Sequence, residues 1–167
     1  AVLVPLNTRM MEPELRDRID RAGLSVLITD ATSADAALAA CDDTDVSVVS
    51  IDRHESVPDL LDISPATYDL PALTPNDVQT MLFTSGTTGT PKGVALTSTN
   101  LAINAAASAF RLGVVPGDRW YVPLPMYHMG GLAPIYRSVL YGSSVIIEDR
   151  ADGFDAEQTL TAMHEMA

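Results

Sequence analysis

The chain has 167 residues, 47% of them apolar and 19% charged, so we expect one folded domain or one domain with a fragment of a second. Ten Lys and Arg residues against 22 Asp and Glu residues give a formal net charge of −12, which repels phosphate backbones and anionic membrane surfaces. We therefore expect no nucleic acid or membrane-surface partner. Arg111 and Arg137 interrupt the longest apolar stretches, so no membrane span is expected either.

Short apolar runs alternate with helical patterns over residues 1–52, which predicts a βαβαβ segment. Pro13 lies in the first turn of the first predicted helix and Gly23 ends it, while Ser33 is suited to cap the second. Strands separated by helices of this length form parallel sheets, so the sequence predicts an α/β fold of parallel βαβ layers. The expected strands are 1–6, 24–29 and 46–51.

A proline-rich irregular connection, 53–76, precedes a second segment of expected strands and helices, 77–167. Its expected strands are 78–84, 93–96, 120–124 and 144–147, and its expected helices are 98–111, 130–141 and 155–167. The chain opens on an apolar run and stops inside a helical pattern, so we expect a fragment of a longer protein.

The choice of charged residues is unusual, with 16 Asp against 6 Glu and Lys92 as the only lysine beside 9 Arg. A composition of this kind favours a halophilic protein, and we take a haloarchaeal source as the hypothesis; an ordinary acidic protein is the alternative. Cys41 is the only cysteine, so no internal disulfide can form. With no secretion signal evident, we expect a cytoplasmic protein.

The most informative segment is a predicted loop, 84–93, which reads Thr-Ser-Gly-Thr-Thr-Gly-Thr-Pro-Lys-Gly. Glycines let backbone N–H groups approach and face an anion, while hydroxyls and an ammonium add further donors. The segment therefore predicts a polyphosphate-binding loop, with a flexible surface hairpin as the alternative. It is not a Walker A loop, which needs Gly before the Lys and Ser or Thr after it.

This motif resembles the signature loop of the adenylate-forming superfamily, which contains acyl-CoA synthetases, luciferases and the adenylation domains of peptide synthetases. In that superfamily the loop holds the β- and γ-phosphates of ATP. A His common after the following strand is missing here, although Asn100 matches, and we expect a hydroxyl to cap the helix instead. The resemblance implies phosphate binding by Thr84, Ser85, Gly86, Thr87, Thr88, Gly89 and Lys92.

A second block, 122–132, resembles the superfamily segment in which an aromatic–His pair borders the acyl pocket. The resemblance implies that His128 acts in catalysis, by orienting the carboxylate or gating the pocket, and that Tyr127 and His128 bind the substrate. A hydrogen-bonded structural His and ordinary core packing are the alternatives. Arg137 is a further expected substrate ligand, with a surface or salt-bridging Arg as its alternative.

The stretch 124–142 looks most like the o-succinylbenzoate–CoA ligases of menaquinone synthesis, with medium- or long-chain fatty-acid–CoA ligases as the second choice. The resemblance implies that ATP, Mg²⁺ and coenzyme A are used to activate a small carboxylic acid. The carboxylate would attack the α-phosphorus of ATP, and the thiolate of coenzyme A would then displace AMP.

The resemblance covers residues 1–167 as a fragment of the large N-terminal AMP-binding domain, without the C-terminal domain. The superfamily's adenine and ribose motifs and its C-terminal catalytic Lys do not occur in the chain, and no metal ligand is assigned. We therefore expect the isolated chain to be inactive. A truncated chain with only weak phosphate binding is the alternative of another class, and the oligomeric state stays open.

Overall fold

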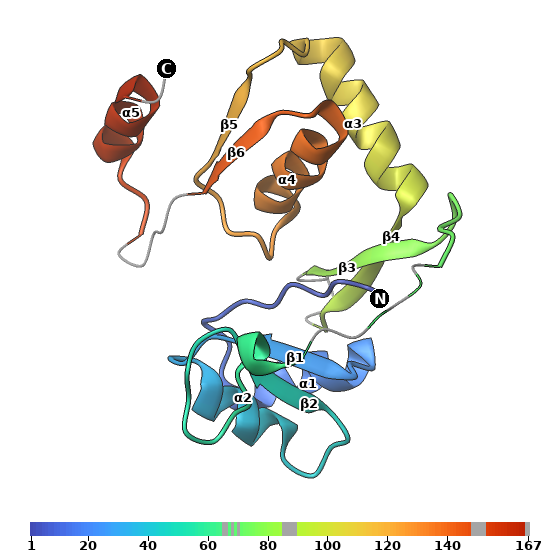
Figure 1. Cartoon of the computed structure of the whole chain (residues 1–167), viewed down its shortest axis with the longest axis vertical. Coiled ribbons are helices and arrows are strands. Elements are labelled where there is room, and N and C mark those ends of the chain that lie inside the picture. The colour runs from blue at the N-terminus through green and yellow to red at the C-terminus, as the bar shows by residue number, and fades with distance from the viewer. Residues whose placement is uncertain (65–66, 68, 70, 85–89, 148–152, 166–167) are drawn as a thin grey trace. The chain divides into compact units, whose positions relative to one another are not determined.

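The computed structural model describes residues 1–64, 67, 69, 71–84, 90–147 and 153–165 (Figure 1). Two compact units emerge, which we call unit 1 (Ala1–Pro5, Thr74–Ser85 and Val94–Ala167) and unit 2 (Leu6–Leu73 and Gly86–Gly93). The elements in chain order are α1 (Glu12–Ala22), β1 (Val26–Thr29), α2 (Ala34–Cys41), β2 (Ser47–Ser50), the short 3-10 helix η1 (Leu60–Asp62), β3 (Val78–Thr84), β4 (Lys92–Thr97), α3 (Ser98–Leu112), β5 (Arg119–Val122), α4 (Met129–Tyr141), β6 (Ser144–Ile147) and α5 (Ala156–Glu165).

Unit 2 contains a parallel βαβ arrangement, as the sequence predicts. β1 pairs with β2 in parallel, from Val26 opposite Ser47 to Thr29 opposite Ser50, and α2 connects the two strands. Small side chains on α2 let it pack closely against β1 and α1. The buried cluster at this junction consists of Ile19, Leu27, Ala37, Ala40 and Cys41.

The ends of α1 follow the sequence signals. The Glu14 carboxylate accepts a hydrogen bond from the backbone N–H of Met11 (3.1 Å), and Gly23 ends the helix in the left-handed conformation, with φ of 60°. The start of α2 differs from the prediction, because the Ser33 side chain makes no capping hydrogen bond. Instead, the Asp30 carboxylate accepts from the backbone N–H of Ser33 (2.7 Å).

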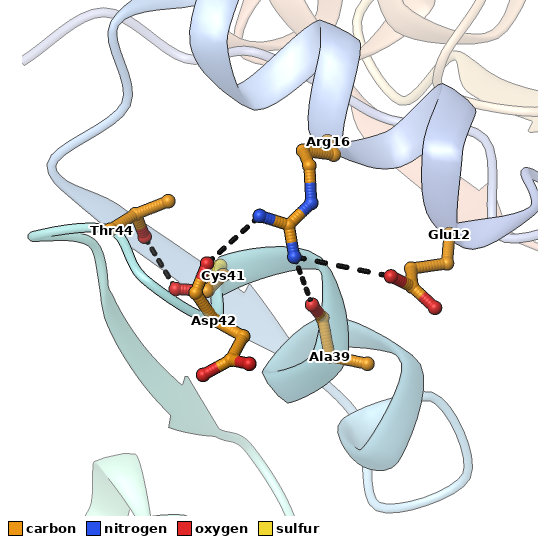
Figure 2. Close-up of polar contacts among 6 residues, drawn as sticks. All are labelled: Glu12, Arg16, Ala39, Cys41, Asp42 and Thr44. Atoms are coloured by element: carbon orange, nitrogen blue, oxygen red, sulfur yellow. Dashed lines mark hydrogen bonds and ion pairs between the residues drawn. The ribbon is translucent and has the colours of Figure 1, made fainter.

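Arg16 ties α1 to the end of α2 (Figure 2). Its guanidinium donates to the backbone carbonyls of Ala39 (2.7 Å) and Asp42 (2.9 Å), and its ion pair with Glu12 spans 3.9 Å. The last carbonyls of a helix have no partner within the helix and carry partial negative charge. A cation from the neighbouring helix therefore stabilises the C-terminal end of α2.

The expected first strand at 1–6 is not a strand of this sheet. Leu3 makes one parallel bridge with Thr80 of β3, and its carbonyl accepts hydrogen bonds from the backbone of Met81 (2.9 Å) and the hydroxyl of Thr80 (2.8 Å). The first five residues thus belong to unit 1. The connection 53–76 is irregular where it is described, apart from η1 and two isolated bridges.

Unit 1 holds β3, the part of β4 from Val94 on, and a second parallel βαβ arrangement, in which α4 connects β5 to β6. The register of the parallel pair runs from Arg119 opposite Ser144 to Val122 opposite Ile147. The α/β class with parallel strand pairs is therefore confirmed. In the described part of the chain, no helix combines the length and apolar character needed to cross a membrane.

Candidate phosphate loop and acyl-pocket segment

The predicted phosphate loop lies between two paired strands. β3 ends at Thr84 and β4 begins at Lys92, and both side chains are exposed. Because paired strands hold their connecting loop by both ends, Thr84 and Lys92 bracket the segment on a sheet scaffold. The other expected phosphate ligands, Ser85, Gly86, Thr87, Thr88 and Gly89, lie outside the described residues.

The junction after β4 is fixed by a capping box at the start of α3. The Thr97 hydroxyl accepts from the backbone N–H of Asn100 (3.3 Å), and the Asn100 side chain accepts from the backbone N–H of Thr97 (2.9 Å). The Thr99 hydroxyl also donates to the carbonyl of Pro75 (2.7 Å). The expectation that a hydroxyl caps this helix is confirmed, with Thr97 as the capping residue.

Tyr127 and His128 lie side by side at the entrance to α4. Their ring centroids are 4.6 Å apart and the ring planes are inclined at 57°. His128 is the N-cap residue of α4, and its side chain makes no capping hydrogen bond. The imidazole of His128 is exposed and Tyr127 is half-buried. The two rings therefore combine apolar ring faces with polar groups, the imidazole nitrogens and the phenol hydroxyl.

Close backbone packing sets the direction in which α4 leaves this segment. A Cβ atom added to Gly131 would lie 2.4 Å from the carbonyl oxygens of both Leu124 and Pro125. The backbone N–H of His128 also donates to the Pro125 carbonyl (3.1 Å). Glycine therefore lets the first turn of α4 fold back onto the turn that carries Tyr127 and His128.

Arg137 has partners inside unit 1. Its Nε and Nη2 atoms donate to the Asn104 Oδ1 atom on α3, at 3.2 Å and 2.9 Å, and its guanidinium carbon lies 5.8 Å from the centroid of the Trp120 ring. Arg137 follows His128 by nine residues, which corresponds to about 13.5 Å along a helix and about two and a half turns. The structure therefore does not bring Arg137 together with His128.

The sequence does not indicate that Asn104 and Trp120 are partners of Arg137. The contact with Asn104 joins positions 33 residues apart, so no local pattern shows it. The role of Gly131 had a visible signal, the Gly130–Gly131 pair directly after His128. Within the described ranges, no group of three or more His, Cys, Asp or Glu side chains could hold a metal ion.

Comparison with known proteins identifies the family. The AMP-binding enzyme family model matches residues 1–167. A 2-succinylbenzoate–CoA ligase of Bacillus licheniformis is 39% identical over 101 residues, which are 60% of this chain and 20% of the relative. One from Bacillus cereus is 33% identical over 152 residues, which are 91% of this chain and 29% of the relative.

Solved structures with a similar fold include o-succinylbenzoate coenzyme A synthetase of Bacillus subtilis in complex with ATP and magnesium ion, with a TM-score of 0.78 and 27% identity over 96% of this chain and 31% of that one. ATP-bound MatB of Rhodopseudomonas palustris has a TM-score of 0.79 and 27% identity over 98% of this chain and 32% of that one. The chain thus spans at most about a third of the length of these relatives. The family match and the fold agree, and the chain belongs to the AMP-binding enzyme family.

Proposed function

We propose that this chain is part of an ATP-dependent acid–CoA ligase and that its loop 84–93 binds the β- and γ-phosphates of ATP. The observation that carries the proposal is the Gly-, Ser- and Thr-rich loop sequence between the paired strands β3 and β4, in a chain that matches the AMP-binding family throughout. Thr84 and Lys92 lie at the two ends of this loop, where β3 ends and β4 begins. The hydroxyl of Thr84 and the ammonium of Lys92 are both suited to donate hydrogen bonds to a polyphosphate.

The loop's part in the reaction is charge stabilisation. As the substrate carboxylate attacks the α-phosphorus, negative charge develops on the departing pyrophosphate, and preorganised donors aimed at that charge lower the barrier. Lys92 supplies a compact positive charge, and Thr84 supplies a hydroxyl. Mg²⁺ would neutralise part of the phosphate charge, and the described residues contain no group of three or more His, Cys, Asp or Glu side chains that could hold it.

For the acyl substrate we propose o-succinylbenzoate, which places the reaction in menaquinone synthesis. Support comes from relatives named 2-succinylbenzoate–CoA ligase and from the similarity of fold to a synthetase bound to its acyl-adenylate, at a TM-score of 0.73 and 25% identity. Tyr127 and His128 are the proposed substrate-facing pair, with His128 orienting the carboxylate. Arg137 is left out of this pair because Asn104 and Trp120 are its partners.

The proposal is tested by thioester formation with the complete protein, the polypeptide that carries this chain and the remaining parts of the domain. We expect kcat/KM for o-succinylbenzoate to exceed that for octanoate by about 100-fold, or about 2.7 kcal/mol in the transition state. His128→Ala should lower both the rate and this preference, whereas His164→Ala, a change at an exposed residue of α5, should lower neither. Equal or better use of octanoate would favour a fatty-acid–CoA ligase instead.

We also propose that the 167-residue chain by itself does not turn over, since the superfamily's adenine, ribose and C-terminal Lys elements are not in its sequence. ATP–pyrophosphate exchange above background by the purified chain would contradict this.

We propose, in addition, that the protein is cytoplasmic and halophilic. The single, buried thiol of Cys41 and the net charge of −12 support this setting.

A further inference from the structure

Arg137 lies where two helices and a strand of unit 1 meet. From α4 its guanidinium makes two hydrogen bonds to the side-chain oxygen of Asn104 on α3 and lies over the ring of Trp120 on β5. Two donors on one acceptor, with an aromatic face beneath them, hold a planar guanidinium in one orientation. Asn104 therefore occupies the Nε–Nη2 edge of the guanidinium, the edge that would otherwise be suited to pair with a carboxylate.

A second contact joins the same two helices one turn further along. The Tyr141 hydroxyl donates to the backbone carbonyl of Ala105, and the Tyr141 ring lies 6.4 Å from that of Trp120. The last part of α4 is thus attached to the middle of α3 by side chains of Arg137 and Tyr141. At the start of α4, Gly131 lies directly against the backbone of residues 124–125, the turn that leads into the helix itself.

These attachments link α3 to α4, and both helices lie within unit 1. α3 follows β4 without a break at Thr97, and His128 is the N-cap residue of α4. The position of His128 relative to α3 therefore depends on how α4 is attached to α3. Pro134, inside α4, lacks an N–H and removes one helical hydrogen bond between the attached end and His128, so a displacement is expected to pass along the helix only in part.

We propose that Arg137 and Asn104 form a clamp between α3 and α4 that positions the Tyr127–His128 pair, so that Arg137 is a positioning residue and not a ligand of the acyl substrate. The clamp is defined by contacts within unit 1 alone. Its effect on catalysis rests on the proposed function, so the test needs one measurement that requires no activity and one that does.

The first measurement is hydrogen–deuterium exchange of the complete protein, followed in peptides that cover residues 124–132. Asn104→Leu and Arg137→Met remove the clamp and should each speed amide exchange in this segment by about fivefold or more. Asn104→Asp keeps the Oδ1 acceptor and should retain protection, as should Arg111→Met, which removes an exposed Arg from the same helix α3. Peptides over β1, in unit 2, report on general loss of stability and should not change.

The second measurement is steady-state kinetics with the same variants. Asn104→Leu and Arg137→Met should both raise KM for the acid by about 5- to 20-fold and leave KM for ATP unchanged, with Asn104→Asp close to wild type. If Arg137 were a substrate ligand, Arg137→Met alone would raise that KM, and the clamp would be rejected. Unchanged exchange at 124–132 in both clamp variants would also overturn the proposal.

Failure of the clamp and failure of the proposed function give different results. A wild-type protein that forms no thioester with any acid would contradict the proposed function, while the exchange measurement would still decide the clamp. A fall in thermal stability with normal exchange at 124–132 would mark Arg137 as a merely structural residue and contradict its positioning role.

Discussion

Gly131 is the residue at which the smallest change should have the largest effect on the candidate site. A Cβ there would meet two backbone carbonyl oxygens at 2.4 Å, atoms that cannot move without displacing the turn before α4. We expect Gly131→Ala to lower the free energy of unfolding by about 1–3 kcal/mol, in the range of overpacked core substitutions. Urea unfolding of the variant measures this.

Gly130→Ala is the matched control. Its Cβ would meet only the Leu124 Cδ1 atom, at 2.9 Å, and a flexible side chain can move away. The gain in helix propensity, about 1 kcal/mol, should offset that adjustment, so stability should change little. Equal destabilisation by the two variants would show that crowding by the 124–125 backbone is not the cause.

Asp30 makes the stability of unit 2 depend on pH. Hydrogen bonds from Thr32 chiefly, and also from Ser33, lower the pKa of the Asp30 carboxyl from its ordinary value of 3.8, against a smaller opposing effect of burial. A lowered pKa in the folded state means that the contribution is complete above pH 3.8 and is lost as the pH falls through the folded-state value. The pH-dependent part of this contribution comes from the stronger hydrogen bonding of the charged form.

We therefore expect Asp30→Asn to destabilise the fold by about 0.5–1.5 kcal/mol at pH 6, and the difference from wild type to shrink as the pH falls below 3.8. Urea unfolding at both pH values measures the change, with Asp45→Asn at an exposed position as the control. A difference that grows toward low pH would contradict the assignment.

At the scale of secondary-structure elements, the contact of Arg16 with the end of α2 makes a prediction about how the two helices of unit 2 are held together (Figure 2). Arg16→Ala removes two charge-assisted hydrogen bonds to helix-terminal carbonyls and should destabilise the fold by about 1–2 kcal/mol. Arg21→Ala breaks an exposed ion pair with Asp17 and should cost about 0.5 kcal/mol or less. Thermal unfolding compares the two, and equal losses would show that the helix end does not depend on Arg16.

Most elements could be predicted from the sequence because their signals are local. Strands at 78–84 and 144–147 have the predicted bounds, and Gly142 ends α4 in the left-handed conformation, as its place after a helical pattern suggests. The run 1–6 has an equally good strand pattern but forms only the bridge at Leu3. An apolar run becomes a strand only if a partner lies beside it, and local sequence does not state the partner.

In the candidate site, too, features with local sequence signals could be predicted, and features that depend on distant partners could not. The phosphate loop is contiguous, so its ten residues carry the prediction by themselves. The partners of Arg137 come from α3 and β5, and nothing near Arg137 in the sequence indicates them. The sequence therefore suggests a substrate ligand at Arg137, while the contacts with α3 and β5 could be learned only from the structure.

At the scale of the whole molecule, the net charge of −12 predicts that stability rises with salt. Like charges repel in the compact state, and about 1 M salt shortens the screening length to about 3 Å. We expect the Tm to increase steadily from low to molar KCl. A steady fall in Tm over this range would contradict the proposed adaptation to high salt.

The central claim is that the loop 84–93 serves the activation of a carboxylate by ATP. Acid-dependent ATP–pyrophosphate exchange by the complete protein tests it most directly, because exchange requires both phosphate binding and attack of the acid. We expect exchange to depend on o-succinylbenzoate, to fall about 10²–10³-fold in Lys92→Ala, and to persist in Arg111→Ala. The claim would be contradicted if the wild-type protein showed no ATP–pyrophosphate exchange in the presence of o-succinylbenzoate. It would also be contradicted if the exchange rate were the same in Lys92→Ala as in the wild type.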